Sequence, residues 1–234
     1  MTTTTYAIDA TSSHISSIPA NTPYVIGYVS GTRDIEWNPE DFLLFPASHV
    51  IKNYQGYDYP QSLTDSVVDS LHELDVENGA LLPTEAAHII ALRVARGWQW
   101  TTIYGTDATL AKVAQATQAL GAGVWVGHVL CRLADWDLNE QEAAAKVGTQ
   151  IHGITCVGVQ WASPTSNPHT ILGTVGKTLS ELQVDLSIVD LNWINLVTQR
   201  HTTAPVPAAR TGILVELPNG PALTLHSTDG KTWS

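Results

Sequence analysis

Eight short apolar segments, separated mostly by stretches of helical periodicity, constrain this chain more than any other feature of its sequence. Repeated strand–helix units predict a parallel sheet, and eight of them allow closure into a (β/α)8 barrel of the TIM type. An open doubly wound sheet is the alternative, although no Gly-x-Gly-x-x-Gly turn follows any of the segments. The predicted strands are 6–9, 23–29, 49–54, 71–78, 100–105, one between 124 and 136, 154–161 and 184–188.

Local signals mark several of the predicted helices. Asn38-Pro39 is typical of a helix start, with proline in the first turn. Helical spacing follows Pro83, Asp107 is a candidate N-cap, and Asn139 with Glu142 forms a capping-box pattern. Leu179 to Leu182 is expected to form one further turn of helix.

The last part of the chain differs from the rest. We expect the barrel to occupy residues 1–196, with its sheet over roughly 6–195, and an extended linker to cover 197–210. Residues 211–234 then predict a β-hairpin around Pro218-Asn219-Gly220. Because a lone hairpin is marginal in water, this one is expected to pack on the barrel or on another subunit.

Composition narrows the possible partners. The 234 residues carry 11 basic and 22 acidic side chains, for a net charge of −11, which argues against a nucleic-acid or anionic-membrane partner. No apolar run is long enough for a membrane span, and the N-terminus lacks the pattern of a signal peptide. The 2 cysteines, Cys131 and Cys156, predict buried thiols rather than a disulfide framework or a zinc site. We expect no metal and no cofactor.

Acidic residues fall at the ends of predicted strands. Asp75 and Glu77 would share one face of their strand, and two carboxyls this close raise at least one pKa. Alone, the pair is equally consistent with two solvated acids before the Asn78-Gly79 turn. Asp9 ends the first predicted strand and Asp185 lies in the eighth, which is its neighbour in a closed barrel. Four carboxyls facing one cleft suit glycoside hydrolysis, which needs an acid and a second carboxylate.

At this point the sequence resembles the family-25 glycoside hydrolases, the Chalaropsis-type lysozymes, together with their relatives in actinobacteria and phages. The similarity is carried by an ordered set of short motifs that covers roughly residues 6 to 190. The motifs are Ala7-Ile8-Asp9, Leu74-Asp75-Val76-Glu77, Ile103-Tyr104, Ala134-Asp135-Trp136-Asp137-Leu138, Val159-Gln160-Trp161-Ala162 and Val184-Asp185-Leu186.

The resemblance implies a muramidase that cleaves the glycan strand of peptidoglycan. Glu77 would then be the general acid, and Asp75 would orient the reacting N-acetyl group or serve the transition state directly. Asp9 and Asp185 would position substrate and tune the pair. The same motifs imply a substrate-binding set of Tyr104, Trp136, Trp161, Gln160 and Asp135.

The sequence also departs from the family pattern. Ser187 stands where the family usually has asparagine, Asn53-Tyr54-Gln55 replaces Tyr-His-Phe, and the second strand ends in Tyr28-Val29-Ser30-Gly31 without the usual Lys-Ala-Thr-Glu-Gly. The departures bear on substrate choice and activity more than on fold. For Trp136 and Trp161, packing between barrel and helices is the competing interpretation to stacking on a sugar.

Two other functions compete with the glycosidase. A weakly active or inactive phage virion protein, in a tail or on the particle surface, would use the barrel to bind cell-wall glycan and the C-terminal tail to contact other virion subunits. A barrel with an unrelated ligand is the third, because fold does not fix function. For the first two we expect a location in the virion, or in the host cytoplasm before lysis, and action at the bacterial cell wall.

Overall fold

The computed structural model describes residues 2–30, 34–121, 128–172 and 176–200. The chain divides into two units, Met1–His201 and Thr202–Ser234, and the described residues belong to the first. The predicted hairpin at 211–234 and most of the predicted linker lie outside the described residues. Residues 197–200 are part of the first unit, where the amide of Gln99 donates to the carbonyl of Gln199 and Trp98 bridges to Arg200.

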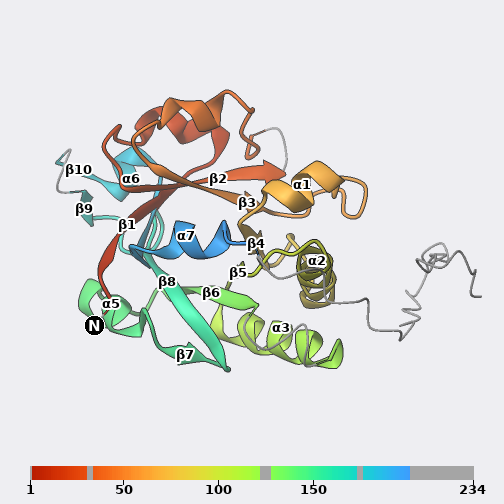
Figure 1. The fold of residues 1–234 in the computed structure, drawn as a ribbon. Helices are drawn as coiled ribbons and strands as arrows, with labels where there is room; N and C mark the ends of the chain where they lie inside the picture. Colours follow the sequence, from red (N-terminus) through yellow and green to blue (C-terminus); the bar gives the residue numbers. More distant parts are fainter. Residues whose placement is uncertain (1, 31–33, 122–127, 173–175, 201–234) are drawn as a thin grey trace, which may run out of the picture. The chain divides into compact units, whose positions relative to one another are not determined.

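A closed mixed barrel forms the centre of this unit (Figure 1). The strand order is β11-β1-β2-β3-β4-β5-β6-β8, and a pairing of β11 with β8 closes the ring. The predicted closure is therefore confirmed. The strands are β1 Thr4–Asp9, β2 Tyr24–Ser30, β3 His49–Tyr54, β4 Glu73–Asp75, β5 Thr101–Gly105, β6 Val129–Ala134, β8 Ile154–Ala162 and β11 Asp185–Asp190.

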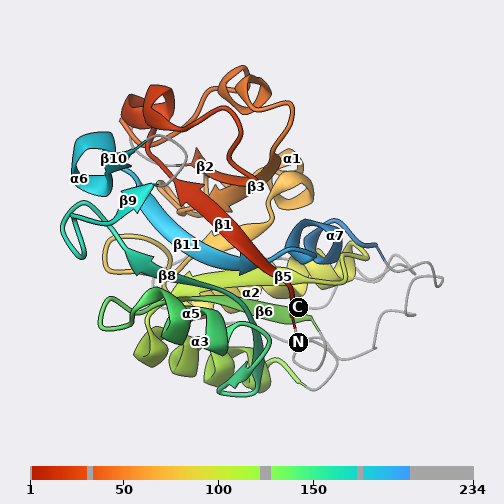
Figure 2. The same ribbon diagram turned by 90° about the vertical axis from the view of Figure 1, so that its left-hand side faces the viewer.

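The expectation that all eight strands run parallel is wrong for the last one. β11 pairs antiparallel with both β1 and β8, and Figure 2 shows β1 and β11 side by side with opposite directions. In its described part, the chain between β8 and β11 forms only the short antiparallel pair β9 (Ile171–Leu172) and β10 (Lys177–Thr178) and the single turn α6 (Leu179–Leu182). A parallel strand needs a crossover, usually a helix that carries the chain back along the barrel. Without one, β11 starts at the end where β8 finishes.

Helices and a short hairpin cover the outside of the barrel, where a large cluster of buried apolar side chains packs between the strands and the helices. None of the described helices is long and apolar enough to cross a membrane. The remaining elements are η1 Ser12–Ser17, η2 Asp41–Leu44, α1 Asp65–Ser70, α2 Pro83–Ala95, α3 Asp107–Ala119, α5 Glu140–Lys146, α7 Trp193–Val197 and β7 Gln150–Ile151, which pairs with β8.

Two of the four predicted helix starts are confirmed. Pro83 opens α2, and the Asn139 side chain accepts hydrogen bonds from the amides of Gln141 and Glu142 at the start of α5. Two predictions need correction. Thr106, whose hydroxyl accepts from the amide of Thr109, caps α3 in place of Asp107. Asn38-Pro39 precedes only the single 3-10 turn η2 rather than an α-helix.

The inside of the barrel changes from apolar to polar along its axis. Side chains two residues apart on a strand share a face, so each strand contributes to successive levels of the interior. At one end these side chains belong to a buried apolar cluster. Two residues further along each strand, towards the other end of the barrel, the inward-facing side chains are polar and also buried. The change from an apolar to a polar side chain is from Ala7 to Asp9, from Ile51 to Asn53, from Leu130 to Arg132 and, on the reversed strand β11, from Val189 to Ser187.

Helix α7 closes the apolar end. It lies in the middle of the ring of strands in Figure 1, and its first residue, Trp193, is fully buried. The indole stacks on Tyr24 at 5.9 Å between ring centroids, and its Nε1 donates to the Thr102 hydroxyl at 2.8 Å. Because this end of the barrel is filled, the polar groups at the opposite end have only one way out to solvent.

We expect Trp193→Ala to lower the free energy of unfolding by about 3–5 kcal/mol, because it removes the largest side chain of the apolar plug and leaves a cavity. The matched control is Leu191→Ala, in the segment between β11 and α7, where the side chain is 48% exposed. It should change the free energy of unfolding by less than about 0.5 kcal/mol. Urea denaturation measures both. Equal losses in the two variants would show that α7 does not plug the barrel.

Candidate functional site

The four predicted acids gather at the polar end of the barrel. Asp9 is the last residue of β1, Asp75 is the last residue of β4, and Glu77 follows two residues later, beyond the end of the strand. Asp185 is the first residue of β11 and pairs directly with Asp9. The reversal of β11 preserves this arrangement, because an antiparallel strand begins at the end where its parallel neighbours finish.

A buried arginine that the sequence analysis missed lies beneath these acids. The guanidinium of Arg132, on β6, is fully buried and donates to both carboxylate oxygens of Glu73, at 2.9 Å and 2.7 Å. It also donates to Asp9 at 3.1 Å. On the other side it donates to the Gln160 side-chain oxygen at 2.6 Å and to the Ser187 hydroxyl at 3.1 Å. One side chain thus connects strands β1, β4, β8 and β11.

The charge of Arg132 compensates two buried carboxyls. Burial raises the pKa of Glu73, and the charge and hydrogen bonds of Arg132 oppose that rise. Burial also raises the pKa of Asp9, against Arg132 and a hydrogen bond from Tyr28. An arginine does not lose its proton, and a guanidinium inside a barrel without a counter-ion would be far more costly than an ion pair. We therefore assign the ionised form to Glu73, which Arg132 binds with two hydrogen bonds.

For Asp75, the charge of Arg132 lowers the pKa less than burial and the neighbouring carboxyls raise it. Asp75 is 2% exposed, and its pKa is raised well above the ordinary value by burial and by the charges of Glu77, Asp9 and Glu73. Among the buried side-chain atoms that the structure describes, its Oδ1 and both polar atoms of Asn53 have no hydrogen-bond partner. These surroundings favour the neutral form of the carboxyl, and a neutral carboxyl can donate a hydrogen bond.

Glu77 is the accessible acid of the group. It is exposed, in contrast to Asp75 and Asp9. Partial burial of its carboxyl raises the pKa of Glu77, and the charge of Asp9 acts in the same direction. A hydrogen bond from Tyr104 and the charge of Arg132 lower it. Glu77 is therefore an acid that solvent or a substrate can reach and whose proton is held more tightly than usual.

The residues expected to bind substrate take three different positions. Tyr104 and Gln160 point into the barrel and belong to the buried arrangement around Arg132. Asp135 and Trp136, directly after β6, are partly exposed. Trp161 faces away from the barrel interior, because it follows Gln160 on the same strand, and it is 7% exposed within the outer apolar cluster. Its indole packs in the core, so it cannot stack on a sugar at this end.

Arg132 and Glu73 both had a signal in the sequence. Glu73 lies two residues before Asp75 on one strand, so the face that carries Asp75 also carries Glu73. Arg132 is the only charged residue of Val129–Ala134. A charge inside an apolar strand requires a buried partner. The register of this strand, however, is fixed by its pairing with β5 and β8, which no local pattern reveals.

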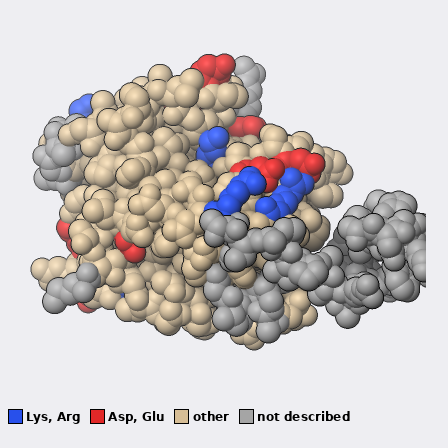
Figure 3. Space-filling model, in the orientation of Figure 1, with Lys and Arg blue, Asp and Glu red and all other residues tan. Residues whose placement is uncertain are grey.

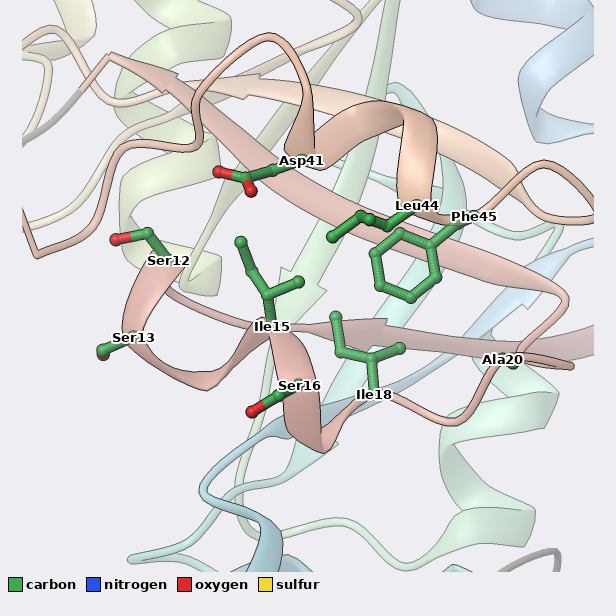
Figure 4. Close-up of a pocket in the computed structure, with 9 residues that line it drawn as sticks. All are labelled: Ser12, Ser13, Ile15, Ser16, Ile18, Ala20, Asp41, Leu44 and Phe45. Carbon is green, nitrogen blue, oxygen red and sulfur yellow. The ribbon is translucent and has the colours of Figure 1, made fainter.

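A hollow of about 440 Å³ lies elsewhere, between η1 and η2 (Figure 4). Its apolar side chains include Ile15, Ile18 and Phe45, which belong to the cluster outside the barrel. Asp41 is its one charged lining residue. We assign the site to the barrel end instead, because reactive groups converge there and not in this hollow.

Charged side chains outside the barrel end form a separate group near α1 and α2 (Figure 3). Arg96 pairs with Asp65 and Asp69, and Arg200 lies 3.7 Å from Asp69. Such exposed pairs contribute about 0–1 kcal/mol each and connect surface elements rather than form a site. In the described ranges, no group of three or more His, Cys, Asp or Glu side chains is arranged to hold a metal ion.

Comparisons of the chain with models of protein families, with curated proteins and with solved structures found no match. Any function assigned to the chain therefore depends on its own residues.

The acids at the barrel end predict a loss of stability with rising pH. Burial, with the charge of Asp9, raises the pKa of Asp185 to about 7 from 3.8. A folded-state pKa above the unfolded value means that the folded protein keeps a proton which the unfolded chain releases. The free energy of unfolding should therefore fall between about pH 4 and 7, by up to about 1.4 kcal/mol per pH unit for one proton.

Asp185→Asn should make that fall less steep, because the variant has no proton to lose at this position. Chemical denaturation at a series of pH values measures it, with Asp137→Asn at an exposed position as the control. If the free energy of unfolding of Asp185→Asn fell with pH as steeply as that of the wild type, the raised pKa of Asp185 would be contradicted.

Proposed function

We propose that the protein is a glycoside hydrolase of lysozyme type that cleaves the glycan strand of peptidoglycan. One observation carries the proposal. An accessible acid, Glu77, stands at the mouth of a closed barrel beside a buried carboxyl with a raised pKa, Asp75, and Asp9 and Asp185 are paired on the adjoining strands. The resemblance to family-25 glycoside hydrolases supports the proposal, because its motifs contain the same four acids. Neither the arrangement of these acids nor the resemblance requires that all eight strands are parallel.

Glu77 is the proposed general acid. Departure of a sugar needs a proton on the glycosidic oxygen, from a carboxyl that is still protonated near neutral pH and that the substrate can reach. Glu77 is exposed and its pKa is raised, so it satisfies both conditions. After transfer its negative charge is stabilised by the hydrogen bond from Tyr104 and by the charge of Arg132, the same two influences that lower its pKa.

The other acids have different roles in this proposal. Asp75, neutral and buried, donates a hydrogen bond to the acetamido group of the sugar and so orients it. Asp185, which is partly exposed, contacts the substrate. Asp9 is buried and bound to Arg132, so it acts on its neighbours through its charge. Asp135 and Trp136, partly exposed after β6, are the remaining candidates for sugar contacts. We place the enzyme at the bacterial cell wall and associate it with phage, as the resemblance implies.

Glu77→Gln tests the proposal. The amide keeps the size of the side chain but cannot donate a proton as an acid, so we expect hydrolysis of purified actinobacterial peptidoglycan to fall 10²–10⁴-fold, about the usual cost of losing general acid catalysis. The variant should stay folded and still sediment with cell walls. The assay is the release of reducing ends, and Glu40→Gln, an exposed acid outside the barrel, is the control that should keep wild-type activity.

Undiminished hydrolysis by Glu77→Gln would exclude Glu77 as the acid. If the wild type binds walls but releases no reducing ends at any pH, a glycan-binding virion protein replaces the enzyme.

A further inference from the structure

Arg132 has no N–H left for a substrate. Its guanidinium offers five N–H groups, one on Nε and two on each terminal nitrogen. The structure shows two hydrogen bonds to Glu73 and one each to Asp9, Gln160 and Ser187. All five acceptors belong to the barrel itself, and the side chain is fully buried. Arg132 therefore cannot be a ligand for a sugar, and its effect on any reaction must pass through other residues.

The route to the proposed acid passes through Tyr104. The guanidinium carbon of Arg132 lies 4.1 Å from the centroid of the Tyr104 ring, and the two residues are direct partners on neighbouring strands. The ring is 4% exposed and is held against the guanidinium by a cation–π contact. The hydroxyl of Tyr104 hydrogen-bonds to Glu77. Contacts thus run without interruption from the buried arginine to the accessible acid.

The barrel reserves space for this arginine. A side chain at position 158, on the neighbouring strand β8, would place its Cβ 3.3 Å from Cγ of Arg132 and 2.9 Å from Cγ1 of Val189. Glycine at 158 therefore leaves room for the arginine stem beside β8. Its partner in register is Arg132 itself. The guanidinium is held by its hydrogen bonds to Glu73 and by its contact with the ring of Tyr104.

We propose that Arg132 is the positioning residue for Glu77, acting through the ring and hydroxyl of Tyr104 and through its own charge. For its catalytic meaning this inference rests on the proposed function, whereas its claim about Glu77 does not depend on hydrolysis. Without Arg132 the tyrosine ring would lose its support, and the acid would lose the positive charge beneath it.

Several groups around Glu77 also influence its proton. Asp9 and Asp185 face it from β1 and β11, and Asp75 and Glu73 lie on β4, the strand that directly precedes it. Tyr104, on β5, is a further titratable neighbour, and Tyr28, on β2, acts on Asp9 and Asp75. Arg132, on β6, supplies the one positive charge that acts on Glu77 among these described groups. Its removal should therefore leave only negative or neutral groups around Glu77 in this part of the barrel.

The test follows the carboxyl carbon of Glu77 by ¹³C NMR while the full-length protein is titrated. Because loss of Arg132 alone would leave Glu73 buried without a partner, the main variant is the double substitution Arg132→Met with Glu73→Gln, which removes the ion pair as a unit. A second variant, Tyr104→Phe, keeps the ring over the guanidinium and removes only the hydroxyl. Arg93→Met is the matched control, because Arg93 is also fully buried and also lies over an aromatic ring, that of Trp98.

We expect the titration midpoint of Glu77 to move upward in both test variants and to stay at the wild-type value in Arg93→Met. In the double variant the loss of Glu73 acts in the opposite direction, but the charge of Arg132 is the larger influence on the pKa of Glu77. An unmoved midpoint in the double variant, or an equal shift in Arg93→Met, would overturn the role of Arg132. A shift in the double variant without one in Tyr104→Phe would overturn the route through Tyr104. If the wild type hydrolyses peptidoglycan, the basic side of its kcat profile should move with the midpoint, because the general acid must be protonated to act. If it does not, a shifted midpoint still supports the positioning role while the proposed function fails.

Discussion

The pairing of Arg132 with Glu73 is the interaction on which the polar half of the barrel depends. Removing two charges from water costs several kcal/mol per ion, and only close geometry with every hydrogen bond made compensates for it. Here the fork of the guanidinium matches both carboxylate oxygens, and its other N–H groups are bound by Asp9, Gln160 and Ser187. Strands that are distant in the sequence are thereby held in one arrangement, and we infer that the network contributes more to specificity of packing than to net stability.

The other end of the barrel explains why the acids can be functional. Trp193 fills the apolar end, while the large apolar cluster outside the strands supplies most of the buried surface. The stability of the fold then rests largely on these clusters, and the polar end can hold groups that destabilise it. Asp75 and Asn53, with buried polar atoms that lack hydrogen-bond partners in the described part of the chain, are such groups. Unsatisfied polar atoms of this kind are expected at a functional site, where a ligand or a reaction uses them.

The sequence was sufficient for features that local pattern determines. Strand and helix positions follow from periodicity and from signals such as Pro83 and Asn139, and closure of the barrel placed Asp9 beside Asp185. The direction of β11 could not be predicted, because it depends on where the chain leaves β8 rather than on the residues of β11 itself. Arg132 was missed because strand register, which decides the face of each side chain, is set by partners distant in the sequence. Trp161 was assigned to the site by motif alone, although alternation with Gln160 already placed it on the outside.

Arg132 keeps Glu73 ionised and leaves Asp75 as the neutral acid beside Glu77. Neutron diffraction from a crystal of the wild-type protein at neutral pH can test this, because it locates the protons on buried carboxyls. We expect deuterium on the Asp75 carboxyl, none on Glu73, and all five N–D groups of Arg132 directed at their acceptors in the barrel. Deuterium on Glu73 with a bare Asp75 carboxylate would contradict this assignment of the protons.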